Sequence, residues 1–405
     1  MRRHDAGMTG QQGHVGRASR WARRGMLWAL VVSVCSLVSL ADAAVRKPRR
    51  DTSLHPPPQI ESALLMEADT GEILYAKDAH KKRPPASMVK MMLMLLVMEK
   101  VRAGEIHLSD SITASTWASK IGGSQIYLRE GETFTLEDLM KGIVIHSAND
   151  ACVAVAEHMA GTVEGFVDLM NERAEALKLA DTRFVSVHGL PPGNGNPSDL
   201  SSAHDLAQLG RLLVKYPEIL GWGGTKEDHL RDGKFILTNT NKLVYQFSGV
   251  DGFKTGFYRE AGFNVTATAQ RDGLRLIAVV MGAPTSIARF DEARRLLAMG
   301  FNSYKKVVVV RREAPVGSEI QVSGSTVRKI RAVAQDDLAV VVKKGLEKKL
   351  VTEVKIPSSI DAPAHRGQPI GEVQVKHQDQ VLAKTAAVVP DEIPKVGLIW
   401  RLIGR

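Results

Sequence analysis

A serine and a lysine stand three residues apart at the start of an apolar stretch, in the run "PPASMVKMMLMLLVMEKV" at residues 84–101. Positions i and i+3 share one face of a helix, so the Ser87 hydroxyl and the Lys90 amine are predicted to be neighbours. A serine hydroxyl needs an adjacent base before it can attack a carbonyl. Lys90 can be that base only as a free amine, which requires a pKa well below its ordinary value of about 10.4. Burial in the apolar helix or a second cation such as Lys254 would lower it.

Two further triplets follow this pair in the chain. S-x-x-K by itself is weak, because it recurs at Ser303. The only S-x-N of the sequence begins at Ser147, 60 residues after Ser87, and the only K-T-G begins at Lys254, 107 residues further on. The three patterns in this order are typical of a serine acyl-transfer site on one α+β domain.

The segments around these triplets resemble the penicillin-binding protein and serine β-lactamase superfamily, and more closely the low-molecular-mass D-alanyl-D-alanine carboxypeptidases. The resemblance is carried by "EADTGEILYAKD", "YLREGETFTLEDLMKGIVIHSANDACVAVAEHMAG", "FVDLMNERAEALKLADTRFVSVHGL", "VDGFKTG" and "AGFNVTATA". It implies a β-lactamase/transpeptidase-like α+β catalytic domain followed by a small all-β sandwich. It also implies release of the terminal D-alanine from peptidoglycan pentapeptides through an acyl-serine intermediate, and reaction of β-lactams with the same serine.

The resemblance also implies roles for individual residues, and no cofactor or metal. Ser87 is the nucleophile, Lys90 its base, Ser147 a proton relay, and Asn149 a hydrogen-bonding partner of Lys90 or the substrate. Lys254, with Thr255 and Gly256, binds the substrate's terminal carboxylate, and the backbone N–H groups of Ser87 and Phe257 form the oxyanion hole. The chain departs from the family pattern at Val89, where Thr is usual, and at Tyr258, which bears on substrate preference and deacylation rate.

The elements that must position these residues can be read from the hydrophobic pattern. A hairpin is expected over residues 61–78 with its turn at 69–71, and strands over 235–244 and 263–283. Helices are expected over 84–101, 135–161 with Thr135 as N-cap, 163–179, 201–216 and 287–304. The methionines after Ser87 are expected to fill the core, and Cys152 to be packed as a small hydrophobe.

The ends of the chain predict export. Residues 1–43 have a basic start, an apolar run and "ADA", which is the pattern of a signal peptide cleaved after Ala43. Its removal takes away six Arg and two Asp, and so lowers the formal charge from +10 to +6. We expect a disordered lead-in at 44–60, the catalytic domain at 61–304 and the sandwich at 305–390.

Residues 391–405 are predicted to form an amphipathic tail. One helical face would carry Val396, Ile399, Trp400 and Ile403, and the basic residues could meet anionic headgroups. The alternative is a tail docked on its own domain. We expect a periplasmic protein, peripheral on the outer face of the inner membrane, whose partners are the stem pentapeptide, β-lactams and the membrane surface.

Three other functions remain open from the sequence. A D,D-endopeptidase acting on cross-links would share all three triplets. A β-lactamase would need a deacylating carboxylate, for which the loop after "HGL" offers only Asp199. A non-catalytic cell-wall binding or shape-determining module would keep the fold. Nucleic acid is a poor partner, because no basic run is interleaved with aromatics, and H-E-x-x-H, G-x-S-x-G and P-loop motifs are absent.

Overall fold

The computed structural model describes residues 59–193 and 195–396, and the structural statements below concern these residues. The predicted signal peptide, the lead-in up to residue 58 and the tail from residue 397 lie outside them. No helix among the described residues is long and apolar enough to cross a membrane.

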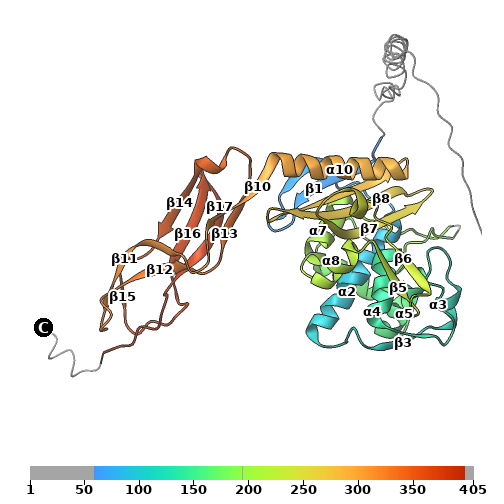
Figure 1. Ribbon diagram of the computed structural model, residues 1–405, viewed down its shortest axis with the longest axis horizontal. Coiled ribbons are helices and arrows are strands. Elements are labelled where there is room, and N and C mark those ends of the chain that lie inside the picture. The colour runs from blue at the N-terminus through green and yellow to red at the C-terminus, as the bar shows by residue number, and fades with distance from the viewer. Residues whose placement is uncertain (1–58, 194, 397–405) are drawn as a thin grey trace, which may run out of the picture. The chain divides into compact units, whose positions relative to one another are not determined.

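The N-terminal domain is built on a five-stranded antiparallel sheet (Figure 1). Its order is β2-β1-β9-β8-β7, with β1 at Ser62–Glu67, β2 at Ile73–Lys77, β7 at Val250–Tyr258, β8 at Gly262–Arg271 and β9 at Leu274–Ala283. The predicted hairpin at 61–78 and the turn between the strands of 263–283 are confirmed. Strand β7, which carries K-T-G, is an edge of this sheet, so one side of its backbone is free to face a ligand.

Helices cover both faces of the sheet (Figure 1). Alternate residues of β1 point to opposite faces. Leu65 belongs to the core beneath α10 (Ser286–Ser303), whereas Leu64 and Met66 belong to the core shared with α2 (Lys90–Ala103) and α7 (Ala203–Leu213). The result is a three-layer α+β domain, as expected.

The remaining elements of the domain lie mainly on the α2 side of the sheet. They are η2 (Ala86–Val89), β3 (Ser111–Thr113), α3 (Thr116–Lys120), β4 (Thr133–Thr135), α4 (Leu136–Lys141), η3 (Gly142–His146), α5 (Asn149–Ala160), α6 (Val163–Ala176), α8 (Pro217–Gly224), β5 (Glu227–Leu230), β6 (Phe235–Thr238) and α9 (Leu243–Gln246).

The prediction of one continuous helix over 135–161 is wrong. Thr135 caps α4 as expected, by accepting a hydrogen bond from the Asp138 N–H. The helix then widens into the π-helical turn η3 and stops at Ser147, whose φ of +69° is left-handed. A new helix, α5, begins at Asn149. The break places the S-x-N triplet at a helix start instead of inside a helix.

The predicted strand over 235–244 is also wrong in its second half. Strand β6 ends at Thr238, and two asparagine side chains then fold the chain into turns. Asn239 Oδ1 accepts the Asn241 N–H, and Asn241 Oδ1 accepts the Leu243 N–H. Such side-chain bonds replace strand pairing and lead into the short helix α9.

The C-terminal domain is all-β, as expected. A six-stranded sheet has the order β14-β16-β17-β12-β11-β15, and β10 pairs with β13. The strands are β10 (Tyr304–Val310), β11 (Pro315–Ser323), β12 (Lys329–Ala334), β13 (Leu338–Lys343), β14 (Leu350–Lys355), β15 (Ser359–Asp361), β16 (Pro369–His377) and β17 (Gln380–Val388).

Two details of this domain differ from a plain antiparallel sandwich ending at residue 390. Strands β11 and β15 pair in parallel. The chain beyond β17 also stays attached, because buried Ile393 forms a bridge with Ala364 and the Val396 N–H donates to the Gly324 carbonyl. The described part of the β domain therefore continues to Val396.

Candidate active site

The nucleophile candidate lies at the junction of η2 and α2. Ser87 is in the short 3-10 helix and Lys90 is the first residue of α2. Ala86, just before the serine, has a φ of +51°, a left-handed conformation that costs energy for a residue with a side chain. The first N–H groups of a helix have no intrahelical acceptor, so the Ser87 amide is suited to bind an oxyanion.

The Lys90 amine is surrounded by four oxygen atoms. Its Nζ lies 2.9 Å from Ser87 Oγ, 2.7 Å from Asn149 Oδ1, 2.9 Å from the His188 carbonyl oxygen and 3.4 Å from Ser147 Oγ. The Asn149 and His188 oxygens can only accept hydrogen bonds. They can take both N–H bonds of a neutral amine, which leaves its lone pair for the Ser87 hydroxyl. The arrangement suits a general base.

Burial explains how Lys90 can be neutral. The side chain is completely buried, and this desolvation lowers the pKa of Lys90 to about 8. Smaller opposing effects come from Cys152, Asp150 and Asp199, which raise it. Burial thus lowers the pKa of Lys90, as the sequence predicted.

The second predicted influence, repulsion from a nearby cation, is present between Lys90 and Lys254. Lys254 is also completely buried, and its pKa is lowered well below the ordinary value, first by burial and then by Lys90 and Arg289. Burial and mutual repulsion therefore disfavour the state in which Lys90 and Lys254 both carry a positive charge.

The S-x-N triplet reaches Lys90 because the helix is interrupted at Ser147. Ser147, in its left-handed conformation, and Asn149, at the start of α5, both turn toward the amine. Asn149 is fixed in turn, since its Nδ2 donates to the Gly122 carbonyl and its N–H to the Ser124 carbonyl, each at 2.7 Å.

The K-T-G triplet approaches the serine from strand β7. A Cβ atom added to Gly256 would lie 2.4 Å from the Pro85 carbonyl oxygen and 3.1 Å from the Ser87 nitrogen, so only glycine fits. Lys254 Nζ donates to the Thr255 carbonyl, and Thr255 Oγ1 to Thr240 Oγ1. Phe257 follows with a half-exposed side chain stacked on Phe263, with ring centroids 4.0 Å apart.

The structure thus brings Ser87, Lys90, Ser147 and Asn149 into one hydrogen-bonded group and places β7 against it. Sequence reasoning missed the His188 carbonyl and Gly189, where a Cβ atom would lie 2.2 Å from the Ala86 carbonyl oxygen. The H-G-L triplet was a usable signal for a close backbone approach.

Arg289 was also missed. Its guanidinium donates to the Gly256 and Asn264 carbonyls and steadies β7 from α10.

Asp199 is unsuited to activating a deacylating water. The residue is buried, and its carboxylate accepts the Val185 and Ser186 N–H groups and the Ser186 hydroxyl. The Asp199 carboxylate therefore stabilises the chain at Val185 and Ser186. Two structural expectations are confirmed, because Cys152 is buried and the methionines of the opening segment fill the core: Met88, Met91, Met92, Met94 and Met98.

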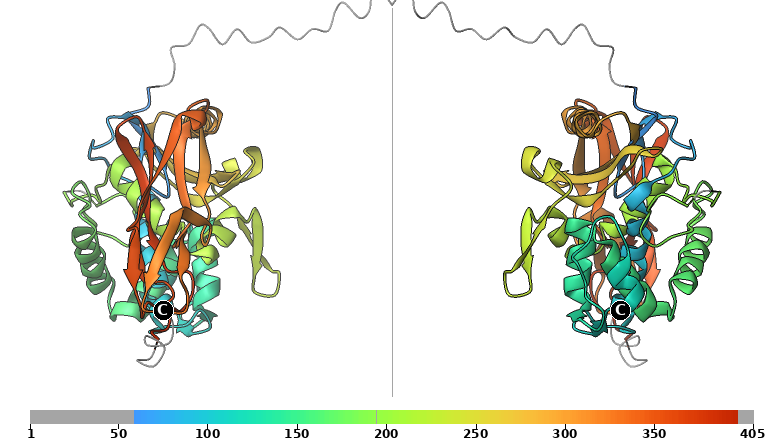
Figure 2. Two further views of the ribbon diagram at one scale, coloured as in Figure 1. Left: turned by 90° about the vertical axis from the view of Figure 1, so that its left-hand side faces the viewer. Right: turned by 90° about the vertical axis from the view of Figure 1, so that its right-hand side faces the viewer.

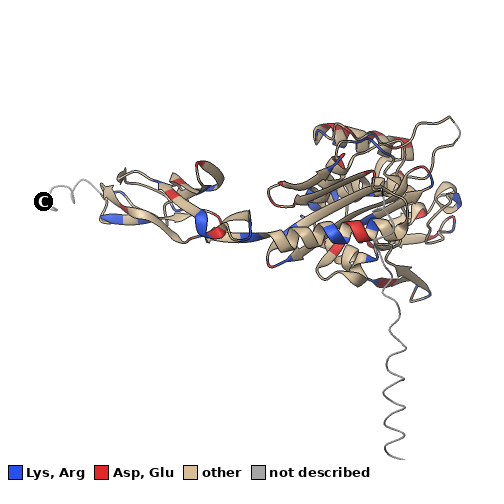
Figure 3. Ribbon diagram, turned by 90° about the horizontal axis from the view of Figure 1, so that it is seen from above, with Lys and Arg blue, Asp and Glu red and all other residues tan. Residues whose placement is uncertain are grey.

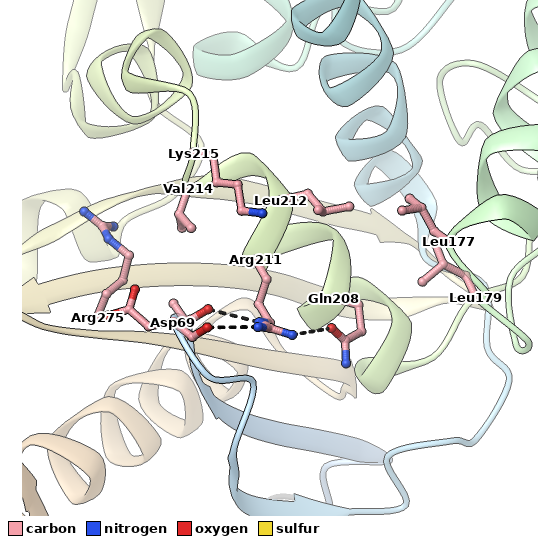
Figure 4. Close-up of a pocket in the computed structure, with 10 residues that line it drawn as sticks. Asp69, Leu177, Leu179, Gln208, Arg211, Leu212, Val214, Lys215 and Arg275 are labelled. Atoms are coloured by element: carbon pink, nitrogen blue, oxygen red, sulfur yellow. Dashed lines mark hydrogen bonds between the residues drawn. The ribbon is translucent and has the colours of Figure 1, made fainter. Parts of the chain in front are cut away.

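A cavity of about 430 Å³ lies away from this group, between the β1–β2 turn and the end of α7 (Figure 4). Its arginines serve the fold. Arg211 donates to the Ala68 and Asp69 carbonyls, and Arg275 forms a two-point ion pair with Asp251.

No cluster of metal-binding side chains occurs among the described residues. Acidic and basic residues are interspersed along the described part of the chain (Figure 3).

A buried amine next to a serine at a helix start, with an edge strand alongside, defines a serine acyl-transfer enzyme on an α+β fold. Comparison with known proteins agrees. The sequence profile described as D-alanyl-D-alanine carboxypeptidase matches residues 51–285, and that described as the penicillin-binding protein 5 C-terminal domain matches residues 304–395. The chain belongs to the D-alanyl-D-alanine carboxypeptidase family.

Relatives match over most of their length. The D-alanyl-D-alanine carboxypeptidase DacF of Bacillus subtilis is 36% identical over 92% of this chain and 96% of its own. Penicillin-binding protein 5 of Haemophilus influenzae superimposes with a TM-score of 0.69 at 30% identity, covering 84% of this chain and 100% of its own. The ampicillin-bound form of penicillin-binding protein D2 from Listeria monocytogenes has a TM-score of 0.55 at 31% identity, covering 60% of this chain and 97% of its own.

Proposed function

We propose that Ser87 is the nucleophile with which this serine-type D-Ala-D-Ala carboxypeptidase removes the terminal D-alanine of peptidoglycan pentapeptides. The observation that carries the proposal is the fully buried Lys90 amine 2.9 Å from Ser87 Oγ, with two acceptor-only oxygens on its other side. A neutral Lys90 takes the serine proton as Oγ attacks the carbonyl of the penultimate D-alanine.

The remaining groups divide the later steps. The N–H groups of Ser87 and Phe257 stabilise the oxyanion. Ser147 passes a proton from Lys90 to the nitrogen of the leaving D-alanine, and the C–N bond breaks. Lys254 and Thr255 hold the terminal carboxylate, whose negative charge favours the ammonium form of Lys254. Water then hydrolyses the acyl-Ser87 ester.

Replacing the nucleophile tests this proposal. We expect Ser87→Ala to lower D-alanine release from a pentapeptide by more than about 1000-fold and to abolish labelling by a fluorescent penicillin. Ser303→Ala is the matched control, because Ser303 begins the other S-x-x-K pattern and ends α10. A penicillin adduct elsewhere than on Ser87, or turnover surviving in Ser87→Ala, would refute the assignment.

The same assay separates the rival functions. A cross-linked peptide dimer that is cut faster than a pentapeptide would identify an endopeptidase. Rapid turnover of penicillin would identify a β-lactamase, against which the occupied Asp199 carboxylate argues. Labelling without D-alanine release would identify a binding module.

We also infer that the enzyme is exported and works at the outer face of the inner membrane. The basic, apolar and "ADA" sequence of residues 1–43 supports cleavage after Ala43. The amphipathic pattern around Trp400 supports a peripheral membrane attachment through the tail.

A further inference from the structure

The loop between α3 and β4, residues 121–128, is bound to the S-x-N triplet by hydrogen bonds. Asn149 binds two of its carbonyls, those of Gly122 and Ser124. Gly123 between them has a φ of +82°, and a Cβ atom there would lie 2.5 Å from Asn149 Nδ2. The position of this loop is therefore set by the same side chain that binds Lys90.

Tyr127 in this loop is held from two sides. Buried Asp150 accepts the N–H groups of Ile126 and Leu128, the residues on either side, whose side chains point into the core. Arg231 donates to the Ile126 carbonyl at 2.7 Å and to the Tyr127 carbonyl at 3.1 Å. Tyr127 itself has a φ of +56°, and its side chain is 66% exposed. The surrounding hydrogen bonds thus hold the Tyr127 backbone in a left-handed conformation that is unfavourable for a residue with a side chain, and this conformation presents the ring to solvent.

A row of rings connects Tyr127 with the catalytic group. The Tyr127 ring lies edge-on to Phe235 at 6.1 Å, and Phe235 lies edge-on to His146 at 5.6 Å. His146 directly precedes Ser147. Phe235 starts β6 in the β5–β6 hairpin, yellow-green in Figure 2, and the turn of this hairpin supplies Arg231. An ion pair between Arg231 and Glu132 fixes the hairpin to the turn that follows this loop.

The difference in burial between the two lysines and Tyr127 indicates which part of a substrate could contact the row of rings. Under the proposed function, the small D-Ala-D-Ala end binds beside Lys90 and Lys254, which are fully buried. The Tyr127 ring, at the outer end of the row, is exposed to the solvent into which the rest of the stem has to extend. The residue before D-Ala-D-Ala is a diamino acid with a long aliphatic side chain, and an aromatic ring is a suitable apolar surface for its methylenes.

We propose that Tyr127 is a specificity-determining residue that contacts the aliphatic side chain of the third stem residue, and that Arg231 is the residue that positions it. The inference rests on the proposed function, since it assumes that the terminal dipeptide occupies the interior of the site. Arg231 acts on Tyr127 through the two loop carbonyls, and its guanidinium also binds Glu132 and lies over the Phe235 ring.

Two substrates that differ only in the third side chain test it. They are acetyl-Lys(acetyl)-D-Ala-D-Ala and acetyl-Ala-D-Ala-D-Ala, and the readout is the ratio of their kcat/KM values. We expect the full chain to prefer the first, Tyr127→Ala to reduce that preference about 10-fold through KM, and Tyr127→Phe to keep it. Arg231→Ala should reproduce the loss. Tyr245→Ala is the matched control, an exposed tyrosine of α9 that contacts Lys226 and Lys242 instead of this loop.

The outcomes separate this inference from the function beneath it. Release of D-alanine from neither substrate by the unaltered enzyme would overturn the proposed function. Release from both, with a ratio that Tyr127→Ala leaves unchanged or that falls equally in Tyr245→Ala, would overturn the role of Tyr127 alone.

Discussion

The charge on one buried amine controls the chemistry of this site. Lys90 lies among oxygens that can only accept, next to a hydroxyl that has to lose its proton. If the amine were charged, it would have no lone pair and could not accept the proton of the Ser87 hydroxyl. Burial removes this obstacle, since the interior solvates a charge poorly and lowers the pKa of Lys90 to about 8.

The pH dependence of acylation follows from this pKa. Below about 8 the neutral fraction of Lys90 grows about tenfold per pH unit, so the rate of labelling by a fluorescent penicillin should rise with pH and level off above that value. Stopped-flow labelling from pH 6 to 9 measures it. A rate independent of pH over this range, or one that still rises steeply at pH 9, would contradict a neutral Lys90 as the base.

At the scale of elements, the site depends on how closely strand β7 and helix η2 can approach. Gly256 and Gly189 flank the Ser87 backbone from two directions, and neither position has room for a Cβ atom. The approach brings the β7 backbone beside the serine, where the proposed oxyanion donors of Ser87 and Phe257 have to meet. Small displacements matter here, because a shift of about 1 Å in a reacting group can cost about 100-fold in rate.

Substituting Gly256 tests the closeness of these elements. In Gly256→Ala the added methyl would collide with the Pro85 carbonyl, so β7 has to move outward and penicillin acylation should fall about 100-fold. Circular dichroism should show a retained fold. Gly221→Ala in α8 is the control, because nothing lies within 4 Å of its Cβ position and alanine favours a helix. Equal acylation rates in the two variants would show that the approach is not limiting.

For the whole molecule, the structure indicates where the C-terminal tail can be cut. Ile393 and Val396 are bound to the β domain, so removing residues from 391 onward would damage that domain as well as the tail. The amphipathic pattern continues after Val396. A chain ending at Val396 thus separates attachment to a membrane from stability of the domain.

Membrane attachment can be measured with that truncation. The mature full-length chain should cosediment with vesicles of phosphatidylglycerol and phosphatidylethanolamine, and loss of residues 397–405 should lower the bound fraction several-fold while penicillin labelling persists. Phosphatidylcholine vesicles control for charge. Equal sedimentation of the two chains would exclude the tail as the attachment.

The sequence by itself determined the class of chemistry and most elements. Spacing on a helix put Ser87 beside Lys90, and strand-like runs joined by turn residues predicted β1, β8 and β9, because these are local properties of the chain. The tertiary structure decided the rest. The break at Ser147, the His188 carbonyl on Lys90 and the contact of Gly256 with Pro85 join residues far apart in the chain. Such contacts depend on packing between elements, which periodicity within one element does not encode.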